Sequence, residues 1–154
     1  MNNFYKHKAK IEIRFSDLDV LGHVNNAHYL SYFEQARINY FKEAIGNNIN
    51  WAKKGVILAS ATLDFLKPIF LNDNIFVFTK CQRVGKKSFI LLHSIVKETP
   101  RGEDEVARGT TVMVCFDYEN RSSMDVPNEW KDKLTIYEYG NTQPPGNAEH
   151  EERG

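Results

Sequence analysis

The sequence lacks the features that mark secreted and membrane-spanning proteins. No apolar run of about 18 residues occurs in the chain of 154 residues, and the polar, basic stretch at its N-terminus has no apolar core behind it. We therefore expect no membrane insertion and no export.

An excess of charge of one sign is also missing. The chain has 20 Lys and Arg against 20 Asp and Glu, so its formal net charge is zero. A neutral chain has no strong global field to gather nucleic acid or an anionic membrane surface. We expect no nucleic-acid partner, and any polyanionic ligand must bind to a local basic patch.

Cysteine is scarce, and the two cysteines do not form a metal motif. Cys81 and Cys115 lie in apolar, strand-like stretches, without the CxxC or Cys/His spacing of zinc sites. A calcium-loop pattern beginning at Asp17 is also incomplete, because Leu21 stands where a third oxygen ligand is needed. The sequence predicts two buried free thiols in a reducing, cytoplasmic setting, and no metal site.

Hydrophobic periodicity predicts one helix and several strands. Residues Lys8 to Phe15 alternate as a half-buried strand does, and apolar residues from Ala27 to Ile45 recur at helical spacing. After about Gly55 the chain is strand-like, over residues 56–66, 75–84, 88–97 and 106–118. Short links rich in Pro, Asn, Asp and Gly favour antiparallel neighbours. The predicted fold class is α+β, with one antiparallel sheet packed on one long helix.

The predicted elements form a single domain over residues 1–137. Residues 138–154 carry no large apolar side chain after Tyr139 and are predicted to be a flexible tail. Five long strands offer more apolar surface than one helix of about five turns can cover. Association with further copies of the chain would cover the rest, so we expect a homo-oligomer.

The densest polar segment, Asp17 to Asn26, lies between the first strand and the long helix. Unpaired N–H groups at a helix start favour developing negative charge, and a nearby carboxylate supplies a base or a nucleophile. Together these groups suit the hydrolysis of an ester or thioester. The alternative is that Asp, Asn and His before a helix serve as caps and fix the loop.

A longer pattern contains this polar segment. The stretch from Arg14 to Leu30, continued by Tyr32 to Arg37, resembles the hotdog-fold thioesterases of the 4-hydroxybenzoyl-CoA thioesterase and acyl-CoA thioester hydrolase family. Further matching pieces follow in family order at residues 64–68, 72–73, 84–89, 106–109, 116–117 and 126–130. The resemblance covers about Lys8 to Leu134, and the ordered combination is far more specific than any single piece.

The resemblance implies a hotdog fold, in which a bent antiparallel sheet wraps around the helix, and hydrolysis of acyl-CoA to a carboxylic acid and CoA. Asp19 matches the catalytic carboxylate, acting as base or nucleophile, and the backbone N–H of Asn26 matches the group that polarises the thioester carbonyl. His23 is either catalytic or bonded within the loop. No cofactor is expected, since coenzyme A is part of the substrate.

The resemblance also implies that each active site lies at the interface of a homodimer or homotetramer. The basic turn after residue 82 would meet the phosphates of CoA, although such a turn can equally be an ordinary solvated hairpin. A neighbouring protomer's strand would approach the helix start. The predicted substrate-binding residues are Arg83, Lys86, Lys87, Ser88, Ala59 and Ser60.

Three other functions stay open. Plant acyl-carrier-protein thioesterases share the Asp-Leu-Asp and His-Val-Asn-Asn pattern, but Leu21 stands at the Asn position of their catalytic set. A non-catalytic acyl-binding module would keep the fold without turnover. A hotdog hydratase or dehydratase fits least, because the patterns of those enzymes do not match the stretch around His23.

Asp17 is interpreted as a structural residue that holds the loop entry with Arg14.

Overall fold

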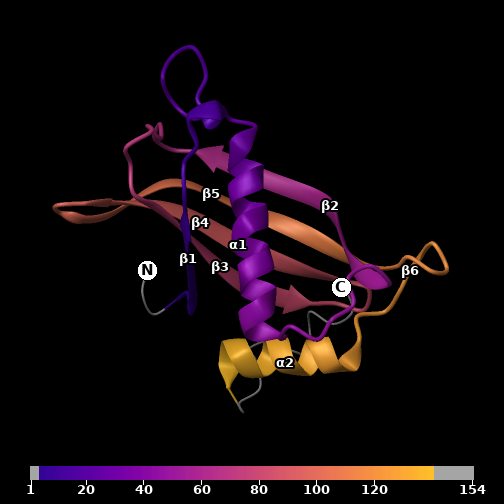
Figure 1. Cartoon of the computed structure of the whole chain (residues 1–154). Coiled ribbons are helices and arrows are strands. Elements are labelled where there is room, and N and C mark those ends of the chain that lie inside the picture. Colours follow the sequence, from indigo (N-terminus) through magenta and orange to yellow (C-terminus); the bar gives the residue numbers. More distant parts are fainter. Residues whose placement is uncertain (1–3, 141–154) are drawn as a thin grey trace. The chain divides into compact units, whose positions relative to one another are not determined.

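The computed structural model describes residues 4–140 (Figure 1). It contains two α-helices, one 3-10 helix and six strands among these residues. In chain order they are β1 (His7–Ile11), η1 (Phe15–Asp17), α1 (His28–Ala44), β2 (Lys54–Phe65), β3 (Ile75–Val84), β4 (Ser88–Thr99), β5 (Gly102–Asp117), β6 (Ser122–Ser123) and α2 (Asn128–Tyr139).

The strands form one sheet with the order β1-β3-β4-β5-β2, and β6 pairs with β5. Strand β1 runs antiparallel to β3, with His7 opposite Thr79 and Ile11 opposite Ile75. Strands β3, β4 and β5 follow one another through short turns, which only antiparallel neighbours allow. The predicted α+β class with an antiparallel sheet is therefore confirmed, and β2 lies at an edge of the sheet.

The described chain divides into two compact units that share the long strands. The first unit takes in residues 4–40, 62–80 and 92–109, and the second takes in residues 41–61, 81–91 and 110–140.

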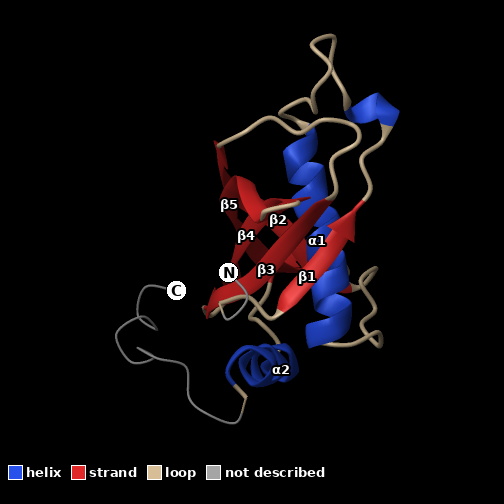
Figure 2. Cartoon of the chain, turned by 90° about the vertical axis from the view of Figure 1, so that its left-hand side faces the viewer, coloured by secondary structure: helices blue, strands red, loops and turns tan. Residues whose placement is uncertain are grey.

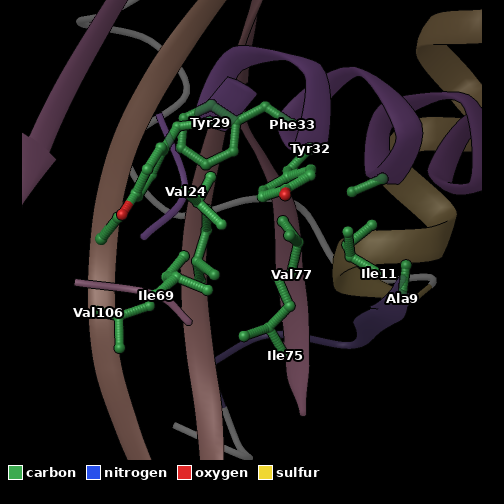
Figure 3. Close-up of a cluster of buried hydrophobic side chains, with 13 residues drawn as sticks. Ala9, Ile11, Val24, Tyr29, Tyr32, Phe33, Ile69, Ile75, Val77 and Val106 are labelled. Carbon is green, nitrogen blue, oxygen red and sulfur yellow. The ribbon is translucent and has the colours of Figure 1, made fainter. Parts of the chain in front are cut away.

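The core of the first unit lies between α1 and the sheet. Tyr29, Phe33 and Ala36 recur at helical spacing on one face of α1 and are fully buried, or nearly so. They belong to one cluster with residues of β3 such as Ile75 and Val77, as Figure 3 shows. Burying each large side chain contributes about 1.5–3 kcal/mol, so this face of α1 holds the helix on the sheet.

An aromatic cluster and α2 form the centre of the second unit. The ring of Trp51 lies 5.6 Å from that of Phe41 and 5.4 Å from that of Trp130, between ring centroids. In α2, only Trp130, Leu134 and Glu138 are buried. The buried Glu138 carboxylate accepts the backbone N–H of Cys81 at 2.9 Å, which fastens the end of α2 to β3.

Helix α2 was not predicted from the sequence. The helix continues through Glu138 and Tyr139, which the predicted tail included. Its buried stripe contains only two apolar residues and a carboxylate, so hydrophobic periodicity gave no helical signal. The remainder of the predicted tail, residues 141–154, lies outside the described residues.

The other predicted elements agree closely with the structure. The first strand ends at Ile11 and not at Phe15, because residues 12–14 belong to no strand and Phe15 begins η1. Cys81 and Cys115 are buried free thiols, as predicted. Within residues 4–140, none of the helices combines the length and apolar character needed to cross a bilayer.

Candidate active site

The segment after η1 forms a tight hairpin that carries the predicted carboxylate. The N–H of Asp19 donates to the carbonyl oxygen of His23 at 3.0 Å, and the N–H of Gly22 donates to the carbonyl oxygen of Asp19 at 3.0 Å. Gly22 has a φ of 85°, a left-handed conformation that favours glycine. Figures 1 and 2 both show this loop at the N-terminal end of α1.

The Asp19 side chain faces the ring of His23 across this hairpin. One carboxylate oxygen accepts the N–H of Leu21 at 2.9 Å. The other lies 3.7 Å from Nδ1 of His23, and the two side chains are 25% and 33% exposed. One oxygen therefore fixes the loop, while the other stays near the histidine and within reach of solvent.

The start of α1 provides a backbone donor next to this loop. Asn25 caps the helix, because its Oδ1 accepts the N–H of Ala27 at 2.9 Å and its carbonyl accepts the N–H of His28 at 3.0 Å. The carbonyl of Asn26 accepts the N–H of Tyr29 at 3.3 Å. Within the described part of the chain, the N–H of Asn26 has no acceptor, and this residue is exposed. Asn26 thus lies directly after the capping residue at the start of α1, with a donor free for a ligand.

Asp17 is a second carboxylate in the same loop, and it is buried. Its Oδ2 accepts the N–H of Arg14 at 3.0 Å and the hydroxyl of Tyr32 at 2.7 Å. Its Oδ1 lies 3.4 Å from Nδ1 of His28. The sequence predicts a link between Asp17 and Arg14, and in the structure this link runs through the backbone N–H of Arg14. The bond to Tyr32 was not predicted, although the spacing of His28 and Tyr32 places both on one face of the helix.

The environment of Asp17 keeps its carboxylate ionised. Burial by itself would raise the pKa of Asp17, but its hydrogen bonds with Arg14 and Tyr32 outweigh that effect and hold its pKa below the ordinary value. Burial and the bond to Asp17 raise the pKa of Tyr32, so the Tyr32 hydroxyl stays protonated and donates.

Exposed apolar side chains occur in the Asp19 loop and in the residues beside it. Phe15 is 80% exposed, Val20 is fully exposed and Leu21 is 74% exposed. Phe70, which is 46% exposed, lies with its ring centroid 6.4 Å from that of His23. Large apolar side chains this exposed are available to meet a ligand or another protein.

The predicted CoA-binding turn belongs to the second unit. Lys86 and Lys87 are exposed in the turn between β3 and β4, which the N–H of Gly85 closes onto the carbonyl of Ser88 at 2.7 Å. Nζ of Lys87 lies 3.4 Å from a carboxylate oxygen of Asp125, so part of the positive charge is offset. The half-buried Arg83 lies near the end of β3.

The remaining predicted residues, Ala59 and Ser60, are exposed on the edge strand β2 in the second unit. The structure therefore brings Asp19, His23 and Asn26 together in one loop. The other predicted site residues are distributed over β2 and the β3–β4 turn, away from that loop in the sequence.

No described residues form a ready-made metal site. Among residues 4–140, no three His, Cys, Asp or Glu side chains gather as a possible ligand set.

A depression of about 390 Å³ in the second unit is lined by residues that include Ile45, Lys53 and Trp130. Its lining contains none of the predicted site residues.

Several known proteins are similar to this chain in sequence. The model of the thioesterase-like superfamily matches residues 13–134. The chain is 28% identical to the long-chain acyl-CoA thioesterase FadM of Escherichia coli, over 82% of this chain and 96% of that protein. It is 29% identical to a 1,4-dihydroxy-2-naphthoyl-CoA hydrolase of Nostoc punctiforme, over 76% of this chain and 78% of that protein.

Several solved structures are similar to this chain in fold. A thioesterase of Thermus thermophilus, crystallised with coenzyme A and zinc, is 32% identical and superposes with a TM-score of 0.72 over 84% of this chain and 98% of its own. A Pseudomonas aeruginosa protein, PA5185, is 26% identical with a TM-score of 0.76, over 86% of this chain and 91% of its own. These likenesses confirm the predicted hotdog fold.

Proposed function

This chain belongs to the thioesterase-like superfamily and is a thioester hydrolase, and we propose that it cleaves acyl-CoA to a carboxylic acid and CoA. One observation carries the proposal. The Asp19 carboxylate and the free N–H of Asn26 belong to one internally hydrogen-bonded loop at the start of α1. These are the two groups that thioester hydrolysis needs, a base or nucleophile and an oxyanion donor.

In the proposed reaction the thioester carbonyl oxygen accepts the N–H of Asn26. As a general base, Asp19 takes a proton from water while the water oxygen attacks the carbonyl carbon. The tetrahedral intermediate then expels the CoA thiolate, which recovers the proton. As a nucleophile, Asp19 would instead form a mixed anhydride that water hydrolyses. The contact with His23 supports a role for that ring in orienting the carboxylate.

The acyl group is proposed to be apolar. Phe15, Val20 and Leu21 expose large apolar side chains beside the catalytic loop, where a polar or charged acyl group would gain no partner. Phe70 extends this surface next to His23. The surface suits a hydrocarbon chain or an aromatic ring, and both occur among the substrates that the relatives are named for.

Coenzyme A is proposed to bind through the basic turn and through a second protomer. Arg83, Lys86 and Lys87 supply positive charge for phosphates, and Ser88 supplies a hydroxyl. The edge strand β2 exposes Ile57 and Leu58 at 39% and 40%, and an exposed apolar edge is a ready surface for pairing between chains. This supports a homodimer or homotetramer in which Ala59 and Ser60 of one protomer complete the site of another.

The reaction requires no cofactor in this proposal, and the buried thiols suit a reducing, cytoplasmic compartment. Release of free thiol from short-chain, long-chain and aromatic acyl-CoAs tests the function. We expect turnover of at least one apolar acyl-CoA by the protein alone. Turnover only of acyl-carrier-protein thioesters would favour that alternative, and binding without thiol release would favour a non-catalytic acyl-binding module.

A further inference from the structure

We propose that Asp17 is the positioning residue of this active site, and that it acts through Tyr32 to hold the Asp19 loop and the start of α1 in one arrangement. This rests on the proposed function, because it assigns the residue to the same site. Asp17 itself need not touch the substrate. Its contacts reach three separate segments of the first unit.

Those contacts join both ends of the catalytic loop to the helix. At the loop entry, Asp17 exchanges bonds with Arg14, whose N–H donates to the carboxylate at 3.0 Å and whose carbonyl accepts the Asp17 N–H at 2.9 Å. At the loop exit, the Asp17 carbonyl accepts the N–H of Asn25 at 2.9 Å. From the helix, Tyr32 donates its hydroxyl to the carboxylate at 2.7 Å.

The reacting groups lie directly beside these anchored positions. Asp19 follows Asp17 by two residues, and Asn26 follows Asn25 by one. A shift of Asp17 would therefore move the base and the oxyanion donor relative to each other. A displacement of about 1 Å between reacting groups can reduce a rate by about 10²-fold, so the geometry of this junction bears directly on turnover.

Capping of α1 does not explain why the Asp17 carboxylate is buried and bonded to several partners. The Asn25 side chain and carbonyl already take the N–H groups of Ala27 and His28, so α1 has its cap. An ionised carboxylate is costly to bury unless its oxygens are bonded, and Asp17 is only 7% exposed. Its oxygens point instead to Tyr32, His28 and Arg14. A side chain that only terminated the helix would not need these cross-links.

Replacement of Tyr32 by Phe removes one hydroxyl from a ring that is 1% exposed and leaves the packing in place. The matched control is Tyr29→Phe, which removes a hydroxyl from the neighbouring ring, 6.4 Å away between centroids, in a residue that makes no bond to Asp17. Both variants are assayed with the best acyl-CoA, well below their melting temperatures. For Tyr32→Phe we expect kcat to fall about tenfold with KM within about twofold, because the geometry of reaction is lost and ground-state binding is kept. For Tyr29→Phe we expect kcat within about twofold of wild type.

A double-mutant cycle shows whether Asp17 and Tyr32 act as one unit. Asp17→Asn should lower kcat further, and adding Tyr32→Phe to it should cost little more. A Tyr32→Phe variant that melts lower but keeps kcat within about twofold would overturn the proposal and leave Asp17 a purely structural residue. If Asp17→Asn does not fold, the comparison of Tyr32→Phe with Tyr29→Phe decides alone. An inactive wild-type protein would instead contradict the proposed function.

Discussion

The backbone of Gly109 in β5 passes so close to Thr62 in β2 that a Cβ atom at position 109 would lie 2.0 Å from the Thr62 carbonyl oxygen. The same atom would lie 3.1 Å from the ring of Phe33 in α1. The contacting atom at Thr62 belongs to the backbone and cannot rotate away. Only glycine allows this close approach between the two strands under the helix.

Replacement of Gly109 by Ala should therefore destabilise the fold. We expect a loss of about 1–3 kcal/mol or more in the free energy of unfolding, as in other overpacked interiors. Urea unfolding followed by circular dichroism measures it. Ser31→Ala, at an exposed position of α1, is the control and should change stability by less than about 0.5 kcal/mol. Equal stability of Gly109→Ala and wild type would contradict this prediction. It would mean that β2 and β5 can move apart at this point without a loss in the free energy of unfolding.

Stability should also depend on pH through His93. Burial, followed by the positive charge of Arg37 and the nearby His7, lowers the pKa of His93 to about 3. The ordinary pKa of histidine is about 6.5. Below that pH the unfolded chain therefore binds a proton at His93 that the folded chain does not bind. The stability contribution of the neutral ring is therefore complete above about pH 6.5 and decreases as pH falls toward the folded pKa.

Urea unfolding at pH 7, 6 and 5 tests this dependence. Wild type should lose up to about 1.4 kcal/mol per pH unit below about 6.5 from this group. His93→Gln should start from a lower stability, because it loses the stacking on Phe33 at 4.5 Å, but its stability should fall less steeply with pH. Parallel slopes for the two proteins would mean that His93 titrates normally.

The sequence predicted the elements with strong periodicity and missed those without it. Helix α1 extends from His28 to Ala44, within one residue of the prediction at each end, because its apolar face repeats over more than four turns. Helix α2 was missed because the third residue of its buried stripe is Glu138, whose burial depends on a bond to the Cys81 N–H from a distant strand. No local pattern encodes such a partner.

The candidate site, too, was predicted from the sequence only in part. The motif places Asp19, His23 and Asn26 in one loop, as the structure has them. The bond between Asp17 and Tyr32 depends on how the helix lies against the loop, so sequence spacing alone could only suggest it. The exposure of the apolar side chains around the loop also required the fold.

The basic turn should contribute to binding of the CoA moiety. Lys86→Ala combined with Lys87→Ala should raise KM for acyl-CoA and leave kcat nearly unchanged, because exposed charges provide uniform binding. The rise in KM should shrink at high salt, since such charges are screened. A control pair, Lys53→Ala with Lys133→Ala, removes the same charge elsewhere in the second unit. An equal effect of both pairs would indicate nonspecific attraction by net charge.

A shared active site should allow complementation between two inactive variants. Asp19→Asn lacks the carboxylate, and Ala59→Trp would block the neighbour's contribution from β2. After mixing under conditions that exchange subunits, part of the activity should return, because some sites then receive two intact halves. Light scattering provides the independent readout. A fully active monomer at the assay concentration would contradict the shared site.

The most direct test of the account is the rate of free thiol release by Asp19→Asn. This variant keeps the size of the side chain and its capacity to accept the Leu21 N–H, and removes its charge and basicity. Asp64→Asn is the matched control, since that carboxylate is 71% exposed and lies in β2 outside the loop. We predict a loss of about 10²-fold or more in kcat for Asp19→Asn, with an unchanged melting temperature, and nearly full activity for Asp64→Asn. Activity of Asp19→Asn within about threefold of wild type would contradict the assignment of Asp19 as the catalytic carboxylate.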